Sequence, residues 1–315
     1  MRRGLLVLLF LLTGPSQLRG ETLYAVVGGW EGWRLVWFDS AAPGTLLGSL
    51  PITGELDYYS DMAIEFDPQT RELYAFAYPQ CQITCPTSPV FPVRIDLASG
   101  ASSWLDWPGF PSFQLALYDF DIHPETRELR TIQYPLINYR YSLSTFELHV
   151  DQPLDTPGRY EALAHPPPGG AHGGETLAIY YPPVYPLVPH LARIGGVGGS
   201  PPASTGEVTV LGAIDVPYYV RGFDISPSGA AYLLAHPDDW TEARLYRLNL
   251  ETLETEDLGA IATPSPGGDF VYAIAAAPRG LGPSIVEIPA LSLSGLVVLA
   301  MLLATAAVWR ARRLV

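Results

Sequence analysis

Lysine is absent from this chain of 315 residues, and all 18 of its basic residues are arginine. Six of the arginines lie at the two ends of the chain: Arg2, Arg3, Arg19, Arg310, Arg312 and Arg313. The 12 that remain in the body are outnumbered by 32 acidic residues, which gives the body a formal charge of −20. Because so negative a body repels a phosphate backbone, the composition argues against nucleic acid as a partner.

The sequence also lacks the signatures of the common enzyme classes. It contains no Gly-x-Ser-x-Gly elbow, P-loop or dinucleotide fingerprint in a strand–turn–helix context, and no pair of histidines has HExxH-like spacing. The glycine-rich segment Gly195–Gly199 is followed by proline and not by a helix, so it is typical of a linker. The six histidines are expected in loops or turns, and the sequence implies no organic cofactor. They are His123, His149, His165, His172, His190 and His236.

Cysteine is scarce. Cys81 and Cys85 are the only two, and they lie in a proline-rich stretch that reads CQITC. In an exported protein, such a pair is typical of a disulfide that closes a loop. The enclosed loop is short, so the expected gain in stability is modest. A redox or metal site would need more ligands than this loop offers.

Residues 1–20 have the three-part organisation of a secretory signal peptide. Arg2 and Arg3 form a positive start, and Gly4–Leu12 is an apolar core too short to span a bilayer comfortably. A small residue at Ser16 offers a cleavage site. The alternatives are a buried N-terminal strand or an uncleaved anchor. We predict export from the cytoplasm.

The C-terminal end predicts a transmembrane helix. Leu291–Trp309 carries no charge and is close to the ~20 residues that a membrane-spanning helix needs. Arg310, Arg312 and Arg313 follow as a membrane stop of the positive-inside kind. A buried core helix is the alternative, but such a helix is not normally apolar on all sides. The predicted topology places the body outside the cytoplasm and the short basic tail inside.

The residues before the apolar segment read IPALSLSG. Together with that segment and the terminal arginines, they resemble the bacterial IPTL-type C-terminal sorting signal, whose pattern is I-P-T-L-S-x-W-G. The matching residues are Ile288, Pro289, Leu291, Ser292 and Gly295. Ala290 and Ser294 stand where threonine and tryptophan are usual. The resemblance implies that residues 285–315 sort a Gram-negative envelope protein to the cell surface and are cut by an exosortase-type membrane enzyme.

The body, residues 21–284, repeats a strand–turn–strand unit. Asp67–Leu73 reads DPQTREL, His123–Leu129 reads HPETREL, and Ser226–Gly229 keeps the same frame with a shorter turn. Alternating apolar and polar residues precede and follow each turn, as in β-strands. Repeated groups of four short strands joined by tight turns are typical of β-propeller blades. A β-sandwich has the same strand content but gives no reason for TREL to recur.

We predict an all-β fold, a five-bladed β-propeller. The expected inner strands begin near Met62, Asp119, Glu161, Gly222 and Ala273. A sixth blade would fit if Pro182–Asp215 contained one. Phe270–Pro278 supplies an inner strand that no outer strands follow. The strands from Leu23 onward are outer strands that no inner strand precedes. Pairing the two would close the ring and remove open sheet edges.

Arg34–Gly54, RLVWFDSAAPGTLLGSLPITG, resembles the start of a bacterial family defined only as a domain of unknown function, with a pattern like LVRFDSANPGTVLSTVPITG. The matching residues are Leu35, Phe38, Asp39, Ser40, Pro43, Gly44, Pro51, Ile52, Thr53 and Gly54. The resemblance implies a propeller-like fold and brings no activity with it.

Three acidic residues occupy one register of the expected inner strands, namely Glu65, Asp121 and Asp224. Because inner strands line the channel of a propeller and alternate residues share a face, the three carboxylates should converge. Converging carboxylates bind a cation such as Ca²⁺ or raise one another's pKa for acid–base chemistry, as in glycosidases. Alternatively, each accepts backbone N–H groups of a neighbouring blade and fixes the spacing of the blades.

Two functions follow from these observations. One is a surface-displayed binding module whose loops recognise a glycan or a protein. The other is a carbohydrate-active hydrolase or lyase that uses the carboxylates of the channel. The second requires Glu65, Asp121 and Asp224 to face an open pocket and not to be engaged with the backbone.

Overall fold

The computed structural model describes residues 20–29, 32–54, 56, 59–79, 91–108, 110, 117–133, 136–170, 172–200, 202–237, 242–265 and 269–278. The chain divides into two compact units, Met1–Leu281 and Gly282–Val315, and all the described residues belong to the first. In these described residues the secondary structure is β-strand, apart from two single-turn 3₁₀ helices, η1 (Val197–Gly199) and η2 (Ala203–Thr205). The all-β prediction is confirmed for the described part of the chain.

Five sheets form the unit, and each is one blade. From the channel outward, blade 1 comprises β21 (Phe270–Ala277), β1 (Thr22–Gly29), β2 (Gly32–Asp39) and β3 (Leu46–Pro51). Blade 2 comprises β5 (Tyr59–Asp67), β6 (Glu72–Pro79), β7 (Phe91–Ile95) and β8 (Ala101–Trp104), with β4 (Thr53–Gly54) added beside β8. Blade 3 comprises β9 (Leu117–Ile122), β10 (Glu128–Gln133), β11 (Ile137–Ser142) and β12 (Leu148–Val150). Blade 4 comprises β13 (Arg159–Ala164), β14 (Thr176–Tyr181), β15 (His190–Ile194) and β16 (Val208–Ala213). Blade 5 comprises β17 (Tyr219–Ile225), β18 (Ala231–His236), β19 (Arg244–Leu248) and β20 (Thr255–Ala260).

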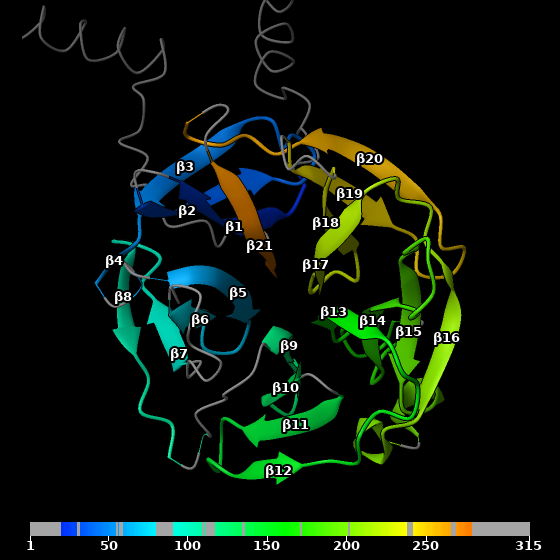
Figure 1. Ribbon diagram of the computed structural model, residues 1–315. Coiled ribbons are helices and arrows are strands. Elements are labelled where there is room, and N and C mark those ends of the chain that lie inside the picture. The colour runs from blue at the N-terminus through cyan, green and yellow to red at the C-terminus, as the bar shows by residue number, and fades with distance from the viewer. Residues whose placement is uncertain are drawn as a thin grey trace, which may run out of the picture. The chain divides into compact units, whose positions relative to one another are not determined.

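The five blades form a closed ring. Each inner strand contacts the inner strand of the next blade, in the order β21, β5, β9, β13, β17 and back to β21. Figure 1 shows these strands around the centre and β3, β8, β12, β16 and β20 at the periphery. The five-bladed prediction is therefore confirmed. The alternative sixth blade is wrong, because Pro182–Asp215 contains β15 and β16, the outer strands of blade 4.

Blade 1 is assembled from both ends of the described chain, as the sequence predicted. β21 pairs antiparallel with β1, with Ala275 opposite Tyr24 and Ile274 opposite Ala25. Tyr24, Ala25 and Ala275 at this seam are fully buried. The pairing leaves β1 with a partner on both sides, so β1 has no open edge.

Apolar residues of the inner strands form the core between blades. Met62, Ile64 and Phe66 of β5 alternate along the strand and are all buried against blade 1, where the Phe66 ring stacks on Tyr24 at 6.3 Å. A fully buried side chain of this size contributes about 1.5–3 kcal/mol relative to an exposed one. The predicted alternation of the inner strands is thus confirmed on their apolar face.

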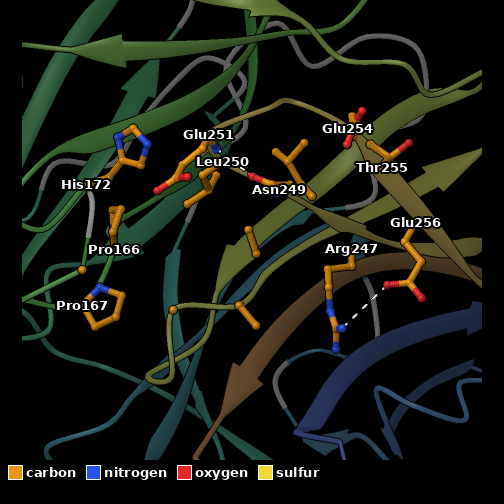
Figure 2. A pocket seen from close by; sticks show the side chains of 15 residues that line it. Pro166, Pro167, His172, Arg247, Asn249, Leu250, Glu251, Glu254, Thr255 and Glu256 are labelled. Atoms are coloured by element: carbon orange, nitrogen blue, oxygen red, sulfur yellow. Dashed lines mark hydrogen bonds and ion pairs between the residues drawn. The ribbon is translucent and has the colours of Figure 1, made fainter.

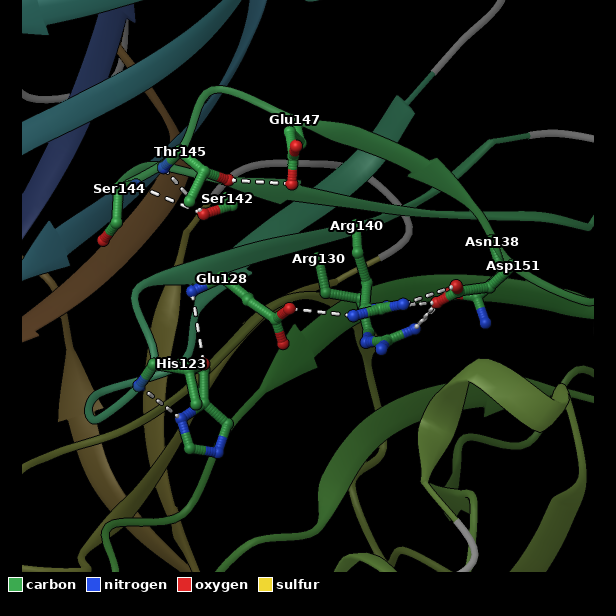
Figure 3. A network of polar contacts seen from close by, with 11 residues as sticks. His123, Glu128, Arg130, Asn138, Arg140, Ser142, Ser144, Thr145, Glu147 and Asp151 are labelled. Carbon is green, nitrogen blue, oxygen red and sulfur yellow. Dashed lines mark hydrogen bonds and ion pairs between the residues drawn. The ribbon is translucent and has the colours of Figure 1, made fainter.

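The TREL repeat has a structural cause. Arg71 and Arg127 hold the left-handed position of their turns, with φ of 61° and 53°. The following glutamate of each pairs with an arginine on the next strand outward: Glu72 with Arg94 at 3.0 Å and Glu128 with Arg140 at 2.8 Å. The leucine that ends each repeat, Leu73 or Leu129, is fully buried. Figure 3 shows Arg140 reaching from Glu128 to Asp151, which Arg130 also contacts.

One member of the repeat also joins two blades. The Nε and Nη2 atoms of Arg127 in blade 3 lie 2.9 and 2.8 Å from Oδ2 of Asp67 in blade 2, whose side chain is fully buried. Oδ1 of Asp67 accepts the backbone N–H of Gln69 at 2.8 Å. The pair therefore fixes the turn of blade 2 against that of blade 3.

We expect Arg127→Gln to destabilise the protein by about 2 kcal/mol, because it leaves the buried Asp67 carboxylate without its cation. The matched control is Arg71→Gln, which changes the same left-handed position in an exposed turn. Chemical denaturation of both variants measures the effect. Equal losses for the two would show that the turn conformation matters and the pair between blades does not.

Three sequence predictions concern segments outside the described residues. They are the signal peptide, the CQITC loop, and the C-terminal segment with its predicted transmembrane helix. Within the described ranges, no helix has the length and apolar character needed to cross a membrane.

Candidate functional site

Glu65, Asp121 and Asp224 converge as predicted. All three line one cavity of about 230 Å³ at the mouth of the channel, which we call the channel-mouth cavity. It opens on the face where the first and second strands of blades 2 to 5 are joined by turns, here called the turn face. Five prolines from these turns line the cavity: Pro68, Pro124, Pro167, Pro168 and Pro227.

Two of the three carboxylates are engaged with the next blade. Asp224 accepts the N–H of Ile225 at 2.5 Å with Oδ1 and the N–H of Ala276 in blade 1 with Oδ2. Asp121 accepts the N–H of Ile122 at 2.6 Å with Oδ1, and its Oδ2 lies 2.7 Å from Nδ1 of His165 in blade 4. These bonds support the role in which the acids fix the spacing of the blades.

The carboxylates repel one another in a buried space. Burial and the neighbouring Asp121 raise the pKa of Asp224 to about 8. Burial, with the nearby Asp224, Asp121 and Asp119, also raises the pKa of Glu65 well above its usual range. No arginine lines the channel-mouth cavity among the described residues. At neutral pH the cluster therefore retains protons, which is the state a general acid needs.

The oxygen donors of this cluster are of the kind that Ca²⁺ prefers. However, both oxygens of Asp224 already accept backbone N–H groups. Within the described part of the chain, no three His, Cys, Asp or Glu residues are arranged to hold a metal ion. Calcium binding by Glu65, Asp121 and Asp224 stays a prediction.

His165 was not predicted as a site residue, yet it is at the centre of a buried polar relay. Its Nδ1 contacts Asp121, and its Nε2 lies 3.0 Å from the hydroxyl of Thr176. His165 lines both the channel-mouth cavity and a second cavity of about 150 Å³, which Thr176 and Arg130 also line. The Asp–His–Thr order is that of a nucleophile relay, but Thr176 is only 4% exposed. One sequence signal indicated this role: His165 directly precedes a turn proline. The residues at the equivalent position in blades 2, 3 and 5 are Asp67, His123 and Ser226.

A pocket of about 580 Å³ lies on the turn face between blades 4 and 5. We call it the interblade pocket. Figure 2 shows His172, Pro166 and Pro167 from blade 4 on one side and the turn Asn249–Glu256 from blade 5 on the other. The sequence did not indicate this pocket, because its two walls are turns about 80 residues apart that each look like ordinary surface loops.

The remaining predicted site residues lie outside the described residues: Cys81, Cys85, Ile288, Pro289, Leu291, Ser292, Gly295, Arg310, Arg312 and Arg313. Of the histidines expected in loops or turns, three lie in strands instead: His149 in β12, His190 in β15 and His236 in β18. Burial lowers the pKa of His236 to about 4, and its Nε2–H donates to the carbonyl of Val271 at 2.7 Å. That histidine is therefore a neutral link from blade 5 to blade 1.

No protein-family model and no curated protein sequence matches this chain. The solved structures similar to it include TolB from Acinetobacter baumannii, with a TM-score of 0.45 and 12% sequence identity. The likeness covers 78% of this chain and 54% of the TolB chain, so the chain spans about half the length of that protein. A likeness at this level assigns no activity.

Proposed function

We propose that this chain is an exported, membrane-tethered β-propeller of the bacterial cell envelope that binds a protein partner through its loops. A single observation carries the binding half of the proposal. Pro183–Leu187, in the connection between β14 and β15, is a run of five consecutive exposed residues, all apolar or aromatic. We call it the apolar loop.

The apolar loop is costly to expose to water. Tyr185 is 93% exposed, Val184 64% and Leu187 52%. Exposed apolar runs of this length are unusual on soluble domains unless they bind something. Between Glu175 and Arg193 the sequence has no charged residue apart from His190. The loop therefore offers apolar contact area with a single polar group, the Tyr185 hydroxyl.

The composition of the loop favours a protein partner over a glycan. Four of the eight residues from Pro182 to Pro189 are proline, which restricts the backbone before binding and reduces the entropy lost on association. An exposed tyrosine on such a support is a typical anchor residue of protein interfaces. A glycan would need several hydrogen-bonding side chains, and the apolar loop has one.

The export half of the proposal depends on the sequence of the two ends. The signal-like residues 1–20, the apolar segment Leu291–Trp309 and the arginines that follow it support a tethered protein whose body lies outside the cytoplasm. The IPTL-like residues from Ile288 support cleavage and surface display by an exosortase-type enzyme. Recovery of the intact chain from the soluble cytoplasmic fraction would contradict this half.

A photo-crosslinking amino acid at position 185 is expected to give one discrete covalent adduct with an envelope protein, because the side chain there is almost fully exposed on the binding loop. The control places the same amino acid at position 146, where Phe146 is also exposed, at 47%, but stands alone on a turn of blade 3. Adding Val184→Ser and Leu187→Ser should abolish the adduct at 185. Identical adducts at both positions, or none at 185, would count against the proposal.

A carbohydrate-active hydrolase or lyase is the second candidate. The raised pKa values of Glu65 and Asp224 in one cavity favour it, since such enzymes use a carboxyl group that stays protonated as their general acid. Glycan turnover that is lost in Glu65→Gln would establish it. The backbone bonds of Asp121 and Asp224 favour the binding function instead.

A further inference from the structure

We propose that the interblade pocket binds a cationic side chain with an aliphatic stem, an arginine or lysine of a basic peptide. The pocket has not been used by any function considered above. It lies on the turn face, whereas the apolar loop lies on the opposite face, because β14 runs from the turn face to that loop. Ligand binding to the interblade pocket can therefore be tested independently of partner binding to the apolar loop.

The first argument is the apolar lining. Six small or aliphatic residues from both blades line the pocket: Pro166, Pro167, Ala230, Ala231, Leu248 and Leu250. The described lining residues include no phenylalanine, tyrosine or tryptophan. Sugars and nucleobases are usually held by stacking on aromatic rings, so this lining fits them poorly. A methylene chain packs well on such residues, as the stems of lysine and arginine do on apolar surface.

The second argument is the charge of the rim. Glu251, Glu254 and Glu256 line the pocket from blade 5, and Arg247 is the only arginine among the lining residues. Arg247 lies 3.6 Å from Glu256 and offsets that one carboxylate, which leaves Glu251 and Glu254 without a cation in the pocket. A phosphate or carboxylate ligand would be repelled here, and an ammonium or guanidinium group would be attracted.

The third argument is the fixed position of His172 on the blade 4 wall. Nδ1 of His172 lies 2.9 Å from Oε2 of Glu175, which is 2% exposed. Oε1 of Glu175 in turn accepts the N–H of Gly198 at 3.0 Å, so the carboxylate is fixed. The fixed carboxylate therefore holds the imidazole ring of His172 in place on the pocket wall.

The acidic turn is held in place before any ligand arrives. Oδ1 of Asn249 accepts the N–H groups of Glu251 and Thr252 at 2.9 and 3.1 Å, and the hydroxyl of Thr252 donates to Glu254 at 3.3 Å. Leu253 takes the left-handed conformation, with φ of 61°, that completes the turn. The carboxylates of Glu251 and Glu254 thus extend from a fixed backbone, which lowers the entropy lost on binding.

The test compares N-acetyl-arginine amide with N-acetyl-citrulline amide, which has the same shape and no charge, by calorimetry or NMR titration of the full chain. We expect arginine amide to bind in the millimolar range and citrulline amide to bind at least about tenfold more weakly. Equal affinity for the two probes, or no binding of arginine amide, would overturn the proposal.

Charge-removing variants locate the site. Glu251→Gln with Glu254→Gln should weaken arginine amide by about tenfold, since two exposed carboxylates are lost. Glu147→Gln is the matched control, because Glu147 occupies the same place as Glu254 in the corresponding turn of blade 3, where the hydroxyl of Thr145 donates to it at 3.2 Å. An equal loss of binding free energy per carboxylate removed would show that only the net charge of the protein matters, and the pocket would be excluded as the site.

Discussion

At pH 8, the Glu65→Gln variant is expected to melt about 5 °C above the wild-type protein. Glu65 is 7% exposed and lies in the field of Asp224, Asp121 and Asp119. Glutamine removes one member of this repelling cluster. It keeps an oxygen to accept the N–H of Phe66 and adds an N–H₂ group that can donate to the neighbouring carboxylates. The expected gain in the free energy of unfolding is about 2 kcal/mol.

The sign of the pH dependence follows from the same cluster. Asp224 and Glu65 have folded pKa values above those of the unfolded chain, so between pH ~4 and pH ~8 the native state binds more protons than the unfolded state. The stability that protonation supplies is present at mildly acidic pH and falls as the pH rises towards 8. The variant should show a flatter profile across this window. Thermal melts of both proteins from pH 5 to pH 9 measure it.

The opposite result is informative. If Glu65→Gln lowers the melting temperature, and if Ca²⁺ raises that of the wild-type protein but not that of the variant, the cluster holds a cation in place of protons. That outcome would contradict the protonated state and support the calcium prediction for Glu65, Asp121 and Asp224. The exposed Glu147→Gln variant serves as the control, and it should leave both the melting temperature and the profile nearly unchanged.

Gly100→Ala is expected to cost about 3–4 kcal/mol, the largest loss of any single substitution considered. Gly100 follows β7 in a turn with φ of 75°, and its carbonyl accepts the N–H of Thr53 at 3.2 Å, where blade 1 meets blade 2. A Cβ atom there would lie 2.2 Å from the carbonyl oxygen of Pro51. The backbone of blade 1 would have to move away, which disturbs the junction.

Gly169→Ala is the control that separates two costs of Gly100→Ala: the steric clash with Pro51 and the strain of a side chain at positive φ. Gly169 also has a positive φ, 85°, but a Cβ atom there meets nothing within 4 Å. Its replacement should cost only about 1 kcal/mol, the usual penalty for a side chain in the left-handed region. Urea denaturation of both variants gives the two numbers. Similar losses would show that the contact with Pro51 relaxes easily and that the junction is more compliant than described.

The sequence predicted most of the ring because the ring is repetitive. The prolines at 68, 124 and 227 fix where each inner strand ends, and strand alternation counted back from them gives the register of Glu65, Asp121 and Asp224. The same reasoning placed the inner strand of blade 4 near Glu161 but missed its outer strands. The inner strand has Leu163 where blades 2, 3 and 5 have an acid, and the outer strands lie in the proline-rich stretch Pro182–Asp215.

The polar relay and the interblade pocket could not be read from the sequence for a different reason. His165 contacts Asp121 across 44 residues, and the two walls of the pocket come from separate blades. Such contacts depend on how far each blade is rotated against the next, which periodicity within a strand does not specify. The apolar loop was present in the sequence as PVYPL, but its exposure depends on what packs over it, and only the fold decides that.

The pairing of β21 with β1 also bears on how the chain is made. During synthesis β1 emerges early, whereas β21 follows only after every other blade has left the ribosome. Until then blade 1 has three strands, and the inner edge of β1 remains open to pairing with another chain. The last strand therefore acts as a latch. Completion of the chain, and not any local step, is the event that commits the ring to its closed form, and cleavage just before Phe270 would reopen it.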